Sequence, residues 1–184
     1  MDTQLICDAI RATGATVPCD SALFLSVLLI HVPLGLTCVV AGIVAMLSRK
    51  GPGRHPSAGT VYYWALSAVF ITATALSAMR WAEDWYLFVL GALSFAAASF
   101  GRMAHRQRWH SWVRLHITGM GSSYILLLTA FYVDNGKNLP LWKELPAIAY
   151  WVLPGAVGIP LIVYALLNHP LVRSRRGSVP AAGG

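Results

Sequence analysis

Most histidines and arginines of this 184-residue chain lie in or near the same three connections between its apolar segments, at 48–57, 102–114 and 169–184. Five of the six histidines share those regions with six arginines: His55, His105, His110, His116 and His169, with Arg49, Arg54, Arg102, Arg106, Arg108 and Arg114. Imidazole titrates near neutral pH and is a common ligand of metals and of haem iron. The pattern therefore indicates ligand binding or redox chemistry.

Two histidines fall inside apolar segments. His116 lies about one turn from the predicted inner edge of its segment and shares a helical face with Trp112, Gly119 and Ser123. His31 lies about 12 Å below the predicted outer edge at 1.5 Å per residue. An ionisable group at such depth is a candidate functional residue. The alternative for His31 is a neutral imidazole hydrogen-bonded to a Ser, a Thr or a backbone carbonyl of a neighbouring helix.

Depth decides which histidines can share one ligand. A bis-histidine haem needs two histidines on different helices at similar depth. His31 and His116 fail this requirement, because they lie about 24 Å and about 5 Å from the inner edge. His55 or His105 with His116 meets it. We expect a site in the inner half of the protein, with these candidate binding residues: His116, His55, His31, Arg102, Arg114 and Ser123. A b-type haem, a metal, a quinone or an anionic lipid headgroup all stay open as its ligand.

The motifs of soluble catalytic sites are absent. The sequence has no HExxH, no GxSxG and no glycine-rich phosphate loop, and no histidine group has strong metal-ligand spacing. No Asp or Glu lies inside an apolar segment, which argues against a carboxylate proton pathway or cation-coupled transport.

The candidate residues are carried by five long apolar segments at 22–47, 58–79, 85–101, 112–133 and 147–168. The connections 48–57, 102–114 and 169–184 hold ten of the fourteen Lys and Arg and no acidic residue. The other connections hold all seven acidic residues. This alternation follows the positive-inside rule and predicts five membrane spans, with the N-terminus outside and the C-terminus inside.

Composition agrees with an all-α, polytopic membrane protein. The chain is 57% hydrophobic and 11% charged, and five spans of about 20 residues use most of its length. The net charge of +7 is better explained by anionic lipid headgroups than by nucleic acid, because the basic residues border the spans. We therefore expect membrane lipids as partners, with other membrane subunits or a second copy also open, in the bacterial inner membrane.

The predicted organisation is an exterior tail (1–21), one five-helix domain (22–168) and a disordered basic cytoplasmic tail (169–184). The exterior tail lacks the basic start and apolar core of a signal peptide. Its Cys7 and Cys19 either form a disulfide or are free thiols. Cys38 is expected to be a packing residue within the first span.

Small residues and prolines predict how the spans pack. Gly35, Cys38 and Gly42 follow His31 on one face, where another helix can approach closely. Pro33 is expected to kink the first span. Two prolines and two glycines weaken the middle of the last span: Pro154, Gly155, Gly158 and Pro160. The link 80–84 is predicted as a tight hairpin.

Several stretches resemble one bacterial family. They are GRHPSAGTVYYWALSAVFITA (Gly53–Ala73), HITGMGSSYILLLTAFYVDNG (His116–Gly136) and YWVLPGAVGIP (Tyr150–Pro160). The chain resembles the family called domain of unknown function 2306, small multi-pass membrane proteins. The resemblance implies the fold and the membrane location but no activity. The positions that match it are His31, His55, Arg102, His116, Gly119, Ser123, Tyr124, Asp134 and Asn135.

Three functions follow as hypotheses. The first is a small binding or redox-related membrane protein whose site is built from His55 and His116 with Arg102 or Arg114. The second is a non-catalytic accessory or assembly subunit that docks other helices through its small residues. The third is a small transporter in which His31, the Pro33 kink and a broken last span line a path.

Overall fold

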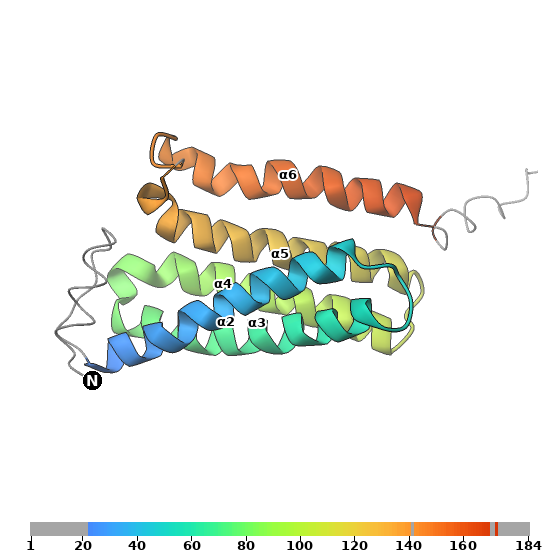
Figure 1. Cartoon of the computed structure of the whole chain (residues 1–184), viewed down its shortest axis with the longest axis horizontal. Helices are drawn as coiled ribbons and strands as arrows, with labels where there is room; N and C mark the ends of the chain where they lie inside the picture. The colour runs from blue at the N-terminus through green and yellow to red at the C-terminus, as the bar shows by residue number, and fades with distance from the viewer. Residues whose placement is uncertain (1–21, 141, 170–171, 173–184) are drawn as a thin grey trace, which may run out of the picture.

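The computed structural model describes residues 22–140, 142–169 and 172. Within them the chain forms five long helices: α2 (Ala22–Leu47), α3 (Arg54–Met79), α4 (Trp81–Arg106), α5 (Trp112–Asn135) and α6 (Ala147–Asn168). A short 3-10 turn, η1 (Gly136–Asn138), follows α5. The helices lie side by side along one axis, with α6 at the edge of the bundle against α5 (Figure 1). The predicted all-α class is confirmed.

Four helices, α2, α3, α4 and α6, are long and apolar enough to cross a membrane. The fifth, α5, has sufficient length but falls outside this apolar set. Gly119, Ser123 and Thr129 are buried on it, because α5 packs against both α4 and α6. A helix covered by protein on two sides needs less apolar surface than one that faces lipid.

The helix bounds agree with the apolar segments and extend beyond three of them. The helix α3 begins at Arg54 rather than at 58, and α4 runs from Trp81 to Arg106 rather than from 85 to 101. The predicted hairpin at 80–84 was wrong in detail, because Arg80 alone separates α3 from α4. Polar residues at a span end can remain helical in the headgroup region.

The prediction of a broken last span was wrong. The helix α6 continues through Pro154 and Pro160 to Asn168. Pro154 is buried, and Gly158 lies so close to Ile125 of α5 that an added Cβ would collide with it. Neighbouring helices often support proline-containing helices in membrane proteins. The packed face on α5 gives α6 this support.

The first two helices meet through the face predicted on α2. His31 Nδ1 lies 2.8 Å from Thr72 Oγ1 of α3, and Cys38 Sγ lies 3.7 Å from the carbonyl oxygen of Tyr62. Cys38 is fully buried, as expected of a packing residue. Gly42 packs under the Tyr124 ring. Gly35 is the exception, since no atom lies within 4 Å of an added Cβ there.

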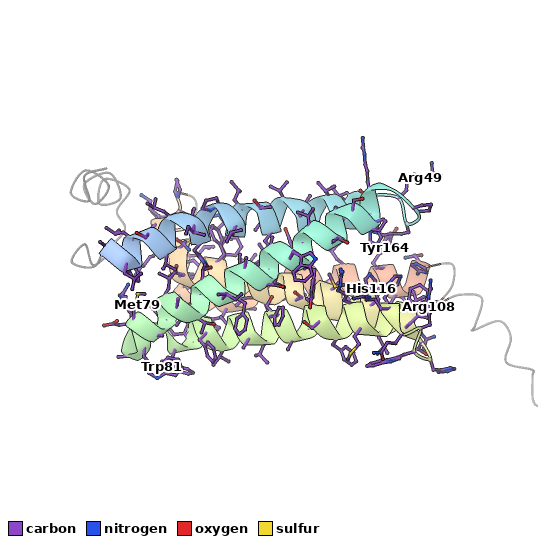
Figure 2. The ribbon with its side chains drawn as sticks, turned by 90° about the horizontal axis from the view of Figure 1, so that it is seen from below. Arg49, Met79, Trp81, Arg108, His116 and Tyr164 are labelled. Atoms are coloured by element: carbon purple, nitrogen blue, oxygen red, sulfur yellow. The ribbon has the colours of Figure 1, made fainter. Side chains whose placement is uncertain are left out.

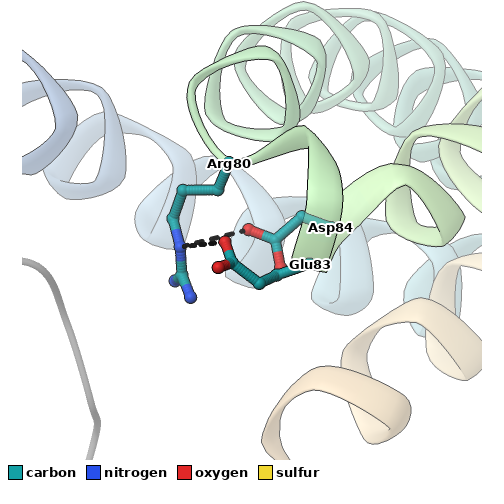
Figure 3. A network of polar contacts seen from close by, with 3 residues as sticks. All are labelled: Arg80, Glu83 and Asp84. Atoms are coloured by element: carbon teal, nitrogen blue, oxygen red, sulfur yellow. Dashed lines mark hydrogen bonds and ion pairs between the residues drawn. The ribbon is translucent and has the colours of Figure 1, made fainter.

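The end of the bundle near Arg80 carries the acidic residues. Arg80 Nε lies 3.3 Å from Glu83 Oε2 and 3.8 Å from Asp84 Oδ2, and both carboxylates belong to the first turn of α4 (Figure 3). Carboxylates are favoured at a helix N-terminus, where the helix dipole is positive. These partly exposed pairs each contribute about 0.2–1 kcal/mol. They tie Arg80, the residue between α3 and α4, to the first turn of α4.

The opposite end carries the other arginines of the described residues. Arg49 and Arg108 lie at this end together with His116, whereas Met79 and Trp81 lie at the other end (Figure 2). The antiparallel order of the helices brings the links 48–53 and 107–111 to the same end. The basic and acidic connections therefore segregate in space as the sequence predicted.

Candidate functional site

Three histidines meet at the basic end of the bundle. His55 comes from the first turn of α3, His105 from the last turn of α4 and His116 from the second turn of α5. The ring centroids of His55 and His116 are 6.3 Å apart, and those of His105 and His116 are 5.2 Å apart. The two pairs predicted from depth are thus both brought together. We call His55, His105 and His116 the histidine cluster.

Backbone carbonyls fix the protons on two of these rings. His55 Nδ1 lies 2.8 Å from the carbonyl oxygen of Ala45, and His116 Nδ1 lies 3.1 Å from that of Gly101. A carbonyl oxygen can only accept, so each Nδ1 carries the hydrogen and donates it. In the neutral ring, Nε2 then holds the free electron pair. Histidines that ligate metals are held in this way.

A close contact between α4 and α5 lets His116 reach its carbonyl. An added Cβ on Gly119 would lie 2.8 Å from both the Ala97 oxygen and the Gly101 Cα. Both glycines are buried, and the two backbones approach closely because neither has a side chain. His116 is one turn from Gly119 on the same face, so the contact positions its ring. The predicted face of α5 is therefore confirmed.

The other predicted site residues lie elsewhere. His31 pairs with Thr72, whose hydroxyl lies 3.0 Å from the carbonyl oxygens of Ala68 and Val69. This contact is the hydrogen bond to a neighbouring helix that the alternative for His31 describes. His31 precedes Ala45, the partner of His55, by fourteen residues, or about 21 Å along α2. His31 therefore does not join the histidine cluster.

Ser123 and the two arginines are also outside the histidine cluster. Ser123 is fully buried two turns further along α5, where its Oγ lies 2.7 Å from Tyr62 Oη. The Arg102 guanidinium lies over the Tyr63 ring, 4.6 Å from its centroid. Arg114 is exposed on α5. These placements leave an imidazole site bordered by arginines rather than a joint His/Arg site.

Sequence reasoning missed a buried polar network below the histidine cluster. Ser94 Oγ of α4 donates to the Ser123 carbonyl oxygen at 2.8 Å and lies 3.3 Å from Ser123 Oγ. With Tyr62, it joins α3, α4 and α5 at one level. The sequence signal for this network is a face of α4 with small residues leading to a histidine. Intervals of four, three and four residues place these side chains on that face: Ser94, Ala98, Gly101 and His105.

The surroundings of the histidine cluster are basic. Lys50 Nζ donates to the carbonyl oxygens of Ala45 and Met46 at the end of α2, at 3.1 and 2.9 Å. Burial lowers the pKa of His169 just beyond α6, and the charge of Lys50 lowers it further. The same basic surroundings therefore favour the neutral form of His169.

Metal coordination by the protein alone finds no support in the geometry. In the described part of the chain, no group of three or more His, Cys, Asp or Glu side chains is placed to hold a metal ion. Two histidines suffice for a haem, whose porphyrin supplies the remaining ligands. Cys7 and Cys19 lie outside the described residues, so their pairing stays a prediction.

No known family model, curated protein or solved structure matches this chain. The likeness to the family of domain of unknown function 2306 therefore stays a prediction. The functional conclusion rests on the geometry of the histidine cluster.

Proposed function

We propose that this chain is a five-span protein of the bacterial cytoplasmic membrane that binds a redox ligand through His55 and His116. The N-terminus is outside, the C-terminus is inside, and the histidine cluster lies in the inner half of the bundle. The observation that carries the proposal is the pair of Nδ1–carbonyl hydrogen bonds, which leaves the Nε2 atom of both rings as an electron-pair donor.

The connectivity supports the fifth span. The helix α5 leaves the basic end after the short link 107–111 and reaches the acidic end, where Gly136 packs on Tyr150 at the start of α6. Its 24 residues extend about 36 Å, which exceeds a bilayer core of about 30 Å. If α4 and α6 both cross, α5 must cross between them. The basic connections then face the cytoplasm.

This topology predicts a simple reporter pattern. Alkaline phosphatase fused after Asn138 is expected to be active, because the acidic connection faces outward. Fusions after Pro52 and after Arg108 are expected to be inactive, and a fluorescent protein at those two positions is expected to mature in the cytoplasm. Equal phosphatase activity at Asn138 and Arg108 would contradict the five-span arrangement.

A b-type haem is the ligand that the cluster supports best. Two imidazoles bound on opposite sides of one metal ion, at about 2 Å per nitrogen, have ring centroids about 6 Å apart. The observed His55–His116 separation is 6.3 Å. The two rings come from different helices at one depth, as a bis-histidine haem requires. The haem would supply one-electron chemistry, and the protein would hold and orient it.

The proposal is tested by visible spectra of the detergent-purified protein, oxidised in air and then reduced with dithionite. A Soret band that sharpens on reduction is expected. His116→Ala and His55→Ala are each expected to lose most of the bound haem, because each variant removes one of the two imidazoles that would hold it. The matched control is His110→Ala, since His110 is exposed at the same end and outside the cluster.

The outcomes separate the remaining hypotheses. A colourless, metal-free sample that also fails to bind added haem would contradict the haem proposal. If that sample instead binds a quinol saturably and His116→Ala loses this binding, the redox role stands with a different ligand. The His116 Nε2 would then accept a hydrogen bond from the quinol hydroxyl. Failure of both ligands would favour a non-catalytic accessory subunit.

Packing in the centre of the bundle disfavours a transport path. The polar side chains there, including Tyr62, Ser94 and Ser123, are paired with one another. In the described residues, no buried side-chain nitrogen or oxygen lacks a hydrogen-bond partner. A transport site needs polar groups that can turn to a substrate. The transporter hypothesis also depended on a broken last span, and α6 is one unbroken helix.

A further inference from the structure

One face of α4 carries two phenylalanines, a serine and, nearest the basic end, two arginines. Intervals of seven, four, three and four residues place them on one side of the helix: Phe88, Phe95, Ser99, Arg102 and Arg106. This side meets α3. The face runs from the acidic end of the bundle to the basic end.

The rings of α3 and α4 form a continuous ladder along the contact between the two helices. The Phe88 and Phe70 centroids are 6.0 Å apart, those of Phe70 and Phe95 are 5.4 Å apart, and those of Phe95 and Tyr63 are 6.0 Å apart. Trp64 extends the ladder from Tyr63 at 5.5 Å. The phenylalanine and tyrosine rings are half-buried, so they offer an apolar surface to an acyl chain.

Arg102 is held at the basic end of this ladder without an acidic partner. Its guanidinium lies 4.6 Å from the Tyr63 centroid, and Tyr63 Oη lies 3.3 Å from Ser99 Oγ. In the described residues, the only ion pairs involve Arg80 and Lys143. The guanidinium has five N–H donors in a planar fork that matches a phosphate. Its charge and geometry are therefore available to an anion.

We propose that the surface along the α3–α4 contact binds one anionic phospholipid, with its phosphate on Arg102 and an acyl chain along Phe95 and Phe70. Arg102 is four residues before the end of α4, about 6 Å along the axis, and its long side chain reaches the headgroup level. Arg106 lies one turn further on the same face and adds positive charge. The site shares no residue with the proposed haem site.

The test uses the purified full-length protein in mixed micelles. Phosphatidylglycerol is expected to raise the thermal midpoint above that in phosphatidylcholine, and native mass spectra are expected to show one retained lipid. Arg102→Gln is expected to weaken this retention about tenfold, because charge-assisted hydrogen bonds to the phosphate are lost. Arg102→Lys is expected to weaken it less, since the charge stays but the planar fork is lost.

The matched control is Arg49→Gln, which removes an exposed arginine at the same end, away from the aromatic ladder. It is expected to retain the lipid-dependent shift. An equal loss in Arg49→Gln and Arg102→Gln would overturn the proposal, because only total charge would matter. Full stabilisation by inorganic phosphate alone would also overturn it. If Arg102→Gln does not fold, Tyr63→Leu, which removes the ring under the guanidinium, replaces it in the test. The proposal then expects weaker lipid retention in Tyr63→Leu than in Arg49→Gln.

Discussion

Gly119→Ala is expected to destabilise the protein by about 1–3 kcal/mol, the usual cost of overpacking a tight core. The added Cβ would lie 2.8 Å from the backbone of α4, and backbone atoms cannot rotate away as a side-chain tip can. The helices α4 and α5 would have to separate. We expect the loss in unfolding experiments that follow the helical signal during titration of the micelles with sodium dodecyl sulfate.

The chain offers a matched control for this substitution. Gly35→Ala makes the same change on α2, where no atom lies within 4 Å of the new Cβ. Its stability is expected to stay unchanged or to rise slightly, because alanine favours a helix over glycine by up to about 1 kcal/mol. If the proposed haem is bound, the Gly119 variant is also expected to lose it, since separation of the helices moves His116 from the Gly101 carbonyl. Equal stability of the two variants would contradict the described α4–α5 contact.

Ser123→Ala is expected to cost about 1–3 kcal/mol, because it leaves a buried hydroxyl without its partner. Tyr62 Oη lies 2.7 Å from Ser123 Oγ and is buried with it. Ser94 keeps its bond to the Ser123 backbone carbonyl, so the loss falls mainly on Tyr62. The same unfolding titration measures the effect.

A double-mutant cycle identifies the cause. In the Tyr62→Phe background, Ser123→Ala is expected to cost less, since no tyrosine hydroxyl remains to be orphaned. Ser57→Ala serves as the control, because its hydroxyl donates to Gly53 at an exposed position. Its effect is expected to stay within about 0.5 kcal/mol. Equal costs of Ser123→Ala in both backgrounds would show that Tyr62 and Ser123 do not interact.

Helix content and the inner histidine pairs were predictable from the sequence. Apolar segments of membrane-spanning length form helices, because a helix satisfies its own backbone hydrogen bonds in lipid. The charge of each connection then indicated which helix ends lie together. Depth along each helix then matched His116 with His55 or His105. In the structure the His116 ring lies 6.3 Å from the His55 ring and 5.2 Å from the His105 ring. The helices and the proximity of these rings thus followed from length, charge and helical rise.

Contacts that depend on how helices cross were not predictable. Gly35 and Gly42 lie on one face of α2, yet only Gly42 is packed, because a neighbouring helix covers just part of that face. Helical period gives the face of a residue but not the point at which the partner approaches it. For the same reason, Ser123 was assigned to the histidine site although its hydroxyl pairs with Tyr62.

The modest apolar content of α5 has a consequence for how the chain enters the membrane. A helix with glycines, serines and a histidine in its first half inserts poorly by itself, because each polar group must leave water without a partner. The five-residue link 107–111 joins α5 to the more apolar α4. In the proposed five-span arrangement, we therefore expect α4 and α5 to enter the bilayer as one hairpin. Their glycine contact would then form before α6 covers the remaining side of α5.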